Sequence, residues 1–521
     1  MKKRQRNKGI FQILLFCSLI TFSSCEDNWT DHYSINKNVV SGKTLWETIQ
    51  STPNLSKFAQ ILKKEGYDKI LSESQMYTVW APVDSALVNF NLDSTLLVKE
   101  FIGNHISRFS YSAVASTNTN ISVLNTKVLI FKSVGANFYF GDAKLLKKNI
   151  VSSNGILHTI DKQVQFFSNI WEYLAKDQRL DSIRSYLYSF NKILFDPKNS
   201  IAGDVNSQGQ TVYLDSVFYN ANVLFRKLGY LNNEDSTFKV ILPTNSAWIS
   251  SYNTIKTYFR YSAGSAGSQY SADTLQRRYT LSSLVKDLVF NSRMQTSPSD
   301  SLTSTQKDVF YNPQHLFDGS EQVTASNGTI YITDQLKYNS WDSWNKTILV
   351  EAEQLAGRDN TFSSVYTRNS TGSAITGISG NKYVEVTPTN PLSNPAIFFS
   401  VPNTLSGTPY NIYCVFVPAT AAGAGVAAAN PCKVNFQLSY LNESGAASSQ
   451  TFTNNGASYI TDNKNLSKVL ITSNFIFPYC NYGQKDNITV KLKVVSNVAQ
   501  NQTALYSRDM LIDCIILEPA H

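Results

Sequence analysis

The residue types that most often carry catalysis are sparse and scattered in this sequence. Histidine, the usual general acid or base near neutral pH, occurs five times, at His32, His105, His158, His315 and His521. None stands in a His-Glu-x-x-His helix, and the chain has no Gly-x-Ser-x-Gly turn, phosphate-binding glycine loop or dinucleotide fingerprint. Paired carboxylates of the glycosidase kind have no fixed sequence spacing, and nothing marks a pair among the 38 acids. The sequence therefore predicts a protein that is not an enzyme, with an unrecognised hydrolase as an open alternative.

The N-terminus has the composition of an export signal. Five basic residues lie in residues 2–8, an apolar run follows from Ile10 to Phe22, and Cys25 comes after two serines. This run of 13 residues is too short to span a bilayer, so residues 1–24 are interpreted as a signal peptide. The pattern resembles a bacterial lipoprotein signal, which implies acylation of Cys25, a tether over residues 25–39 and anchoring to the outer membrane. Glu26 and Asp27 resemble the surface-export signal of Bacteroidetes lipoproteins, which implies that the protein faces the exterior.

Charge and cysteine content agree with an exported protein. The formal charge of +8 falls to +3 once the five N-terminal basic residues are removed, so nucleic acid is not an expected partner. An even number of cysteines in an exported domain predicts two disulfides, and the sequence does not select a pairing. Buried free thiols are the alternative, and zinc is disfavoured because no Cys-x-x-Cys spacing occurs. The four cysteines concerned are Cys414, Cys432, Cys480 and Cys514.

A chain of 521 residues predicts about three domains, and the first two of them repeat. Trp46 and Trp171 each open a segment with helical spacing, and a strand ending in Pro82 or Pro243 follows. Asp84 and Asn245 are expected to cap the helix after each proline. Asn-Gly turns at 154–155 and 327–328, each followed by an alternating strand, complete the repeat over residues 40–167 and 168–338.

These boxes resemble the two conserved motifs of fasciclin-like domains. The first copy matches well and the second diverges, with Leu242 in place of the box alanine. The resemblance implies an α+β fold in which a wedge of strands packs on helices, and it implies adhesion or matrix contact without catalysis. In eukaryotic members a Tyr-His pair between the boxes is proposed to contact receptors, and Asn104 and His105 occupy that place here. The alternative interpretation is that His105 is a packed, hydrogen-bonded helix residue.

The last third, residues 345–521, changes to short alternating strands separated by turns. Eight candidate strands predict an all-β sandwich of the jelly-roll type. They are residues 348–353, 382–386, 396–401, 410–417, 433–440, 468–471, 489–495 and 510–517.

The first and last of these strands resemble those of family 6-like carbohydrate-binding modules and other galactose-binding-like domains. The resemblance implies a structural calcium on the opening glutamates and the late aspartate, here Glu351, Glu353 and Asp513. The alternative is that these carboxylates face solvent and hold no metal. No other cofactor is expected.

Sugar binding needs exposed aromatic rings with polar neighbours, and Tyr479, Asn481 and Tyr482 form the best local candidate. Two functions follow from the sequence. The first is a cell-surface lipoprotein that binds macromolecules or mediates adhesion through its fasciclin-like domains. The second is a glycan-binding accessory lipoprotein of a polysaccharide-uptake system, acting through the C-terminal sandwich. The expected partners are the membrane, through the lipid anchor, and a protein or glycan ligand.

Overall fold

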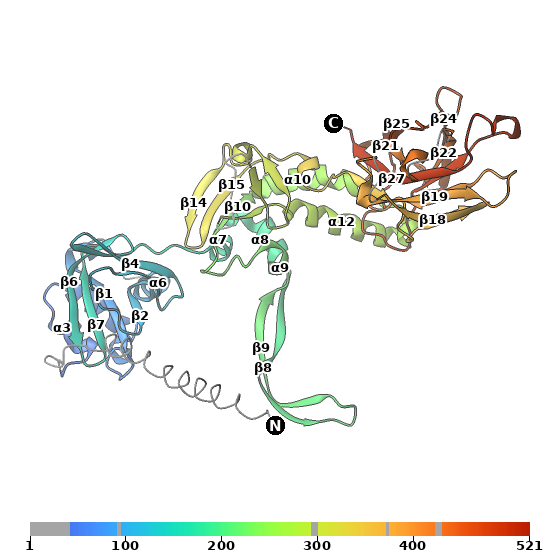
Figure 1. Ribbon diagram of the computed structural model, residues 1–521. Helices are drawn as coiled ribbons and strands as arrows, with labels where there is room; N and C mark the ends of the chain where they lie inside the picture. The colour runs from blue at the N-terminus through green and yellow to red at the C-terminus, as the bar shows by residue number, and fades with distance from the viewer. Residues whose placement is uncertain (1–41, 91–94, 293–300, 371–374, 423–429, 521) are drawn as a thin grey trace, which may run out of the picture. The chain divides into compact units, whose positions relative to one another are not determined.

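The computed structural model describes residues 42–90, 95–292, 301–370, 375–422 and 430–520, in two compact units that divide between Phe167 and Ser168 (Figure 1). The first unit is one α+β domain. The second unit contains another α+β domain and a β-sandwich, so the predicted fold class is confirmed. Cys25 lies outside the described residues. None of the helices in the described part of the chain combines the length and apolar composition needed to cross a bilayer.

The first unit packs short helices against one seven-stranded sheet of order β2-β1-β7-β6-β5-β4-β3. Helix α4 shows why the helices pack there, because Phe58, Ile61 and Leu62 recur at helical spacing and are buried on the sheet. Central strand β1 is buried at all six positions and pairs with β7 in parallel. The elements are α3 (Leu45–Ser51), α4 (Ser56–Lys64), α5 (Tyr67–Ile70), β1 (Tyr77–Pro82), α6 (Thr95–His105), β2 (Ile106–Arg108), β3 (Asn118–Ser122), β4 (Val128–Val134), β5 (Asn137–Phe140), β6 (Ala143–Ser152) and β7 (Gly155–Ile160).

The second α+β domain repeats the central strand pairing residue by residue. Strand β10 pairs in parallel with β15 from Phe238 opposite Gly328, as β1 pairs with β7 from Tyr77 opposite Gly155. The elements are α7 (Ile170–Lys176), α8 (Asp181–Tyr188), β8 (Asn191–Val205), β9 (Thr211–Asn222), α9 (Phe225–Leu228), β10 (Phe238–Pro243), α10 (Asn245–Lys256), α11 (Ala263–Ala266), α12 (Gln269–Val285), β11 (Val289–Asn291), β12 (Ser301–Thr303), β13 (Val309–Tyr311), β14 (Glu321–Ala325) and β15 (Gly328–Thr333).

The asparagine of each Asn-Gly turn makes the same three hydrogen bonds in both domains. Asn154 Oδ1 accepts from the first backbone N–H of α3, at Leu45, over 2.7 Å. Its Nδ2 donates to two carbonyls of the loop that leads into β1. Asn327 Oδ1 accepts from Ile170 of α7 over 3.0 Å, and its Nδ2 also donates to two loop carbonyls. Both asparagines are buried, so these bonds lock the turn to the first helix of each domain.

The expectation that Asp84 and Asn245 cap the helix after the proline is wrong. Asp84 accepts from Ser56 and Lys57, the first two N–H groups of α4, and Asn245 Oδ1 accepts from Ser182 in the first turn of α8. Each side chain therefore caps an earlier helix that packs beside its strand, and α10 is capped by Thr244 instead. The sequence shows which residues follow one another, but it does not show that α4 and α8 fold back to these side chains. The expected caps are therefore assigned to the wrong helices.

The C-terminal domain is a sandwich of two sheets, with orders β18-β19-β27-β21-β25 and β17-β20-β26-β22-β23. All eight predicted strands are present, and β17, β18, β23 and β24 are additional. The strands are β16 (Ile348–Glu351), β17 (Arg358–Thr361), β18 (Ser363–Asn369), β19 (Lys382–Pro388), β20 (Ala396–Ser400), β21 (Pro409–Phe416), β22 (Lys433–Leu441), β23 (Ala447–Phe452), β24 (Tyr459–Ile460), β25 (Ser467–Ile476), β26 (Lys491–Ser496) and β27 (Met510–Pro519).

Within the second unit, the sandwich and the preceding α+β domain share a packed contact. Ser406 of a sandwich loop donates its N–H to Tyr258 O over 2.9 Å, and Cys480 donates to Arg260 O over 2.8 Å. Leu405 and Cys480 are members of the hydrophobic core of the α+β domain. The sandwich loops at residues 405–406 and 480 therefore pack against the α+β domain, where Leu405 and Cys480 are buried.

Candidate functional site

His105 ends helix α6 and is fully buried. Its Nδ1 lies 2.7 Å from Phe101 O, and the Val164 N–H reaches Nε2 over 3.0 Å. Because a carbonyl can only accept, Nδ1 carries the proton and Nε2 is the acceptor, so a neutral ring is fully satisfied. Burial lowers the pKa of His105 to about 4. The predicted adhesion-motif histidine is therefore placed as a structural residue.

Asn104 is buried beside it and has a similar structural task. Its Nδ2 donates to Val164 O over 3.1 Å and to Gln165 O over 3.2 Å. Together with His105 it ties the segment at Val164 to the end of α6. Since both side chains are inside the unit, neither is available to a receptor in this conformation.

His158, on β7, also has hydrogen-bond partners for both ring nitrogens, but here the proton is on Nε2. Its Nε2 donates to Tyr111 O over 3.0 Å, and its Nδ1 accepts from Asn149 N–H over 3.3 Å. The ring stacks against Trp80 at 5.8 Å between centroids, and burial lowers the pKa of His158 to about 4. Neither buried histidine of the first unit can take up a substrate proton, because both nitrogens of each ring are occupied.

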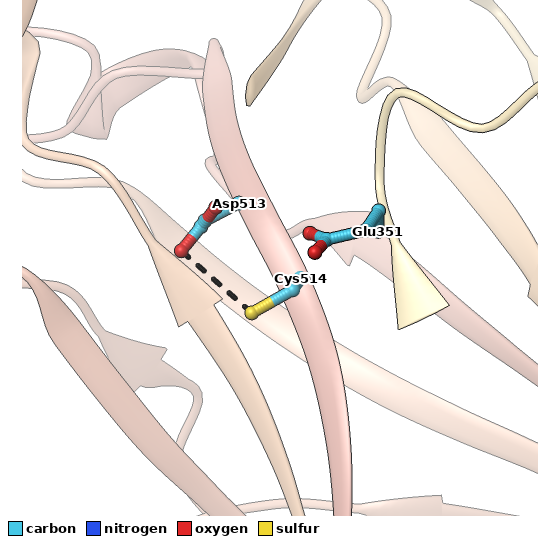
Figure 2. Close-up of side chains that lie close together, drawn as sticks. All are labelled: Glu351, Asp513 and Cys514. Atoms are coloured by element: carbon cyan, nitrogen blue, oxygen red, sulfur yellow. Dashed lines mark hydrogen bonds between the residues drawn. The ribbon is translucent and has the colours of Figure 1, made fainter. Parts of the chain in front are cut away.

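Two carboxylates and a thiol gather where β16 meets β27. Figure 2 shows Glu351 facing Asp513 and Cys514, whose ligand atoms lie within 4.8 Å of one another. Ser379 donates its N–H to Asp513 Oδ1 over 3.0 Å and its hydroxyl to Glu351. Asp513 is buried, and its pKa is raised to about 6 by burial first and then by Glu351 and Glu353. Of the three carboxylates predicted from the sequence, Glu351 and Asp513 thus lie together, and Glu353 is near enough to raise the pKa of Asp513.

The residues of this carboxylate cluster fit a hard cation. Glu351 Oε2 and Glu353 Oε2 are buried, and no group in the described part of the chain donates a hydrogen bond to either. Like charges crowd around Asp513, and a divalent ion would satisfy the open oxygens and remove the repulsion. Cys514 adds a neutral thiol, because burial and the adjacent Asp513 raise the pKa of its Sγ. Glu351, Glu353 and Asp513 would supply the oxygens, so calcium remains the prediction for this cluster.

Tyr479, Asn481 and Tyr482 lie at the contact between the sandwich and the second α+β domain. Asn481 is fully buried, with its amide bonded to Thr404 N–H and Val401 O. Tyr482 O accepts from the Tyr261 hydroxyl over 2.7 Å, and the Tyr482 ring meets Phe259 edge to face. Tyr479 and Tyr482 thus contact the neighbouring domain and Asn481 braces a loop of the sandwich, which leaves no open platform on which a sugar would stack.

Arg260 explains the position of Tyr479. The guanidinium lies 4.7 Å from the centre of the Tyr479 ring and pairs with Glu443 at 3.2 Å. These tyrosines are the best candidate in the sequence for an exposed aromatic platform with polar neighbours. The partner that covers them lies about two hundred residues away in the chain, which no local pattern reveals.

The four cysteines of the sandwich are buried free thiols, so the alternative to the predicted disulfides is what the structure contains. Cys414 and Cys432 belong to the sandwich core, where they pack as small apolar side chains. Burial raises the pKa of Cys480 to about 12 and raises the pKa values of the other three thiols as well. Such thiols are unreactive at neutral pH, so they make no active site.

A pocket of about 520 Å³ opens on the sandwich, and no sequence motif indicates it. An ion pair between Arg368 Nη2 and Glu385 Oε2, at 2.5 Å, crosses from β18 to β19 at its wall. Asp509, directly before β27, also lines the pocket, and its partly enclosed position and the nearby Glu385 raise its pKa. Leu511 and the buried Tyr383 also line the pocket. The lining comes from segments more than a hundred residues apart, so only the folded sheet assembles it.

One segment of the chain is similar to a known protein family. Residues 53–165 match the family model of the fasciclin domain. No curated protein sequence matches the chain.

Solved structures align with parts of the chain. The FAS1 domain pair of the insect cell adhesion molecule Fasciclin I aligns over 56% of this chain and 98% of its own length, at 16% identity and a TM-score of 0.21. The C-terminal family 22 carbohydrate-binding module of Clostridium thermocellum Xyn10B aligns over 33% of this chain and 92% of its own, at 11% identity and a TM-score of 0.21. The CBM22-1 xylan-binding domain of Paenibacillus barcinonensis Xyn10C aligns over 33% and 95%, at 13% identity and a TM-score of 0.21. At these scores the description of the fold rests on the strand order and register of the chain itself.

Proposed function

We propose that this protein is a lipid-anchored protein of the cell surface that mediates adhesion or holds a macromolecule through its fasciclin-like domains, without catalysing a reaction. The observation that carries the proposal is the fasciclin domain over residues 53–165. The repeated strand register gives the chain a second domain of the same design. The locked histidines of the first unit support a binding role, because the groups best suited to acid–base chemistry have no free nitrogen.

The sequence supports the location. Acylation of Cys25 would hold the protein to the outer membrane, since each buried methylene of an acyl chain adds about 0.8 kcal/mol. Glu26 and Asp27 directly after the cysteine favour export to the outer face. Digestion of intact cells with proteinase tests this part, because an exposed chain is removed and a chain on the inner face is protected.

Adhesion is tested with the purified lipid-free chain coated on beads. Beads carrying the native chain are passed over layers of cells and over immobilised matrix proteins, next to beads carrying the chain unfolded by heat. Greater retention of the native beads supports the proposal. Equal retention on every surface would count against it, because a folded binding surface is lost on unfolding.

The glycan-binding role is the second candidate, and the pocket beside Arg368 favours it. A concave site with a paired cation and anion offers hydrogen bonds to the hydroxyl groups of a sugar. A glycan array with the lipid-free chain, repeated with Arg368→Ala, tests it. Lys468→Ala is the matched control, because Lys468 pairs with Glu518 at 2.6 Å on the same sheet but outside the pocket. Binding lost in the first variant alone assigns the pocket, and no binding to any glycan removes this candidate.

A further inference from the structure

A long two-stranded hairpin interrupts the second α+β domain between α8 and α9. Strands β8 and β9 pair only with each other among the described residues, and they extend away from α7, α8 and α9 (Figure 1). An isolated two-stranded ribbon is barely stable in water, and each of its edges offers unpaired N–H and C=O groups. We call residues 191–222 the arm. Both edges of this two-stranded sheet are therefore available for pairing with another strand.

The surface of the arm is apolar along the strands and polar at the turn. Ile193 is 72% exposed, Leu214 77% and Phe218 59%. The turn between the strands contains Asn206, Ser207, Gln208, Gly209 and Gln210.

This distribution argues against a membrane or nucleic acid as the partner. A hairpin that enters a bilayer carries apolar or aromatic residues at its tip, and this tip has none. Two lysines and three aspartates give the arm a net charge of −1, so it has no basic face for phosphates. A protein strand is the remaining occupant.

The free edge of β8 is complementary to itself. Its first half has Lys192 and Asp196 on either side of three apolar residues, Ile193, Leu194 and Phe195. If two copies pair antiparallel with Leu194 opposite Leu194, Lys192 lies opposite Asp196 of the other copy, and Ile193 lies opposite Phe195. Shifting the pairing by one residue in either direction places both charges opposite uncharged residues. Charge complementarity thus selects a second copy of this chain and one register.

The same pairing continues the apolar face of the arm. Phe195 already contacts Tyr213 at 4.6 Å and Phe218 at 5.6 Å between ring centroids, so these three rings share one face. Side chains alternate along a strand, so Ile193 lies on that face as well. The four-stranded sheet of two arms would join both aromatic clusters on one side. We propose that the arm is a self-association site in which the β8 edges of two copies pair antiparallel about Leu194.

The pairing is symmetric, so each substitution acts twice. Lys192→Glu places a glutamate against Asp196 at two positions, and we expect dimerisation of the lipid-free chain to weaken about tenfold or more. Lys198→Glu is the matched control, because the same charge change lies on the same strand beyond the complementary segment. Sedimentation equilibrium measures the dimer dissociation constant of the native chain and of both variants. A monomeric native chain at the highest soluble concentration would overturn the proposal, and so would equal effects of the two variants.

The register is tested with cysteines. Directly opposite residues of antiparallel strands have Cα atoms about 4.5–5.5 Å apart, within the range of a disulfide. Leu194→Cys should therefore give a covalent dimer under mild oxidation with diamide, and Ile193→Cys should not, because the two copies of residue 193 are offset along the strands. Equal yields from both variants would refute the register. Binding of the lipid-free chain to phosphatidylglycerol vesicles that is lost on Leu194→Asp would assign the arm to lipid and overturn the proposal.

Discussion

The two buried histidines predict that the first unit loses stability in mild acid. In the folded chain both rings are neutral and their pKa values are lowered to about 4, compared with about 6.5 for an exposed histidine. Above pH 6.5 neither the folded nor the unfolded state binds the proton. Between pH 6.5 and pH 4 the unfolded chain gains a proton on His105 and on His158 that the folded chain does not take, so unfolding becomes easier as the pH falls.

The pKa difference sets the size of the effect. At pH 5 linkage gives a loss of about 2 kcal/mol for each histidine and roughly 4 kcal/mol for the pair, relative to neutral pH. A domain of this size has a total stability of about 5–15 kcal/mol, so the loss is large. The depressed pKa of Asp84 acts in a different window, because its contribution is lost only as the pH falls below about 4.

The second unit provides an internal contrast. Without a bound cation, Asp513 has a pKa raised to about 6, so as the pH falls from 6 the folded state binds this proton before the unfolded state does. Its protonation therefore stabilises the second unit over the range in which the histidines destabilise the first. The two units should respond to mild acid with opposite contributions from these groups.

The assay is urea denaturation of the full lipid-free chain from pH 7.5 to pH 5, with hydrogen exchange of β7 reporting on the first unit. The free energy of unfolding should fall by up to about 1.4 kcal/mol per pH unit for each histidine. His105→Leu should lower stability at pH 7.5, because the Val164 N–H loses its acceptor, and should halve the slope. His315→Gln, in the second unit, is the control. A slope near zero, or ring signals that titrate near pH 6.5 in the folded chain, would refute the reasoning.

Three further predictions concern the repeat and the carboxylate cluster. Gly155→Ala should cost more than about 3 kcal/mol, since its Cβ would lie 1.9 Å from Tyr77 O, whereas Gly135→Ala meets open space and should cost about 1 kcal/mol; thermal melts of both variants decide. Asn327→Ala should destabilise the second unit by about 3 kcal/mol in urea, because three buried hydrogen bonds are lost, and an effect below 1 kcal/mol would contradict the role given to this turn. Calcium should raise the melting temperature of the native chain and not that of Asp513→Asn; equal shifts would mean that the ion binds elsewhere.

The repeat could be predicted from the sequence because local chemistry fixes it. Gly155 and Gly328 sit where a Cβ would meet the carbonyl of the neighbouring strand, at 1.9 and 2.0 Å, so the residue type itself encodes the approach of the two strands. The sandwich strands were also readable, since their alternation matches one buried and one exposed face. These features depend on residues close together in the chain.

The features that the sequence does not predict are of two kinds. Some depend on contacts between residues far apart in the chain, and the arm makes few tertiary contacts at all. The arm has both faces exposed, so its strands lack the alternation that a buried face imposes, and Pro197 breaks the pattern further. Asp84 caps a helix that starts 28 residues earlier. Tyr482 is expected at the surface from the sequence, but its ring packs against Phe259 of the neighbouring domain. The sequence thus predicts elements better than it predicts which surfaces remain free.

Adherence of living cells tests the central claim most directly. Cells that lack the chain, cells that produce it and cells that produce Cys25→Ala are compared for attachment to the surface that retained the protein-coated beads. We expect attachment to follow the anchored chain, so the unanchored variant leaves cells as poorly attached as cells without the protein. Equal attachment of all three strains would contradict the account.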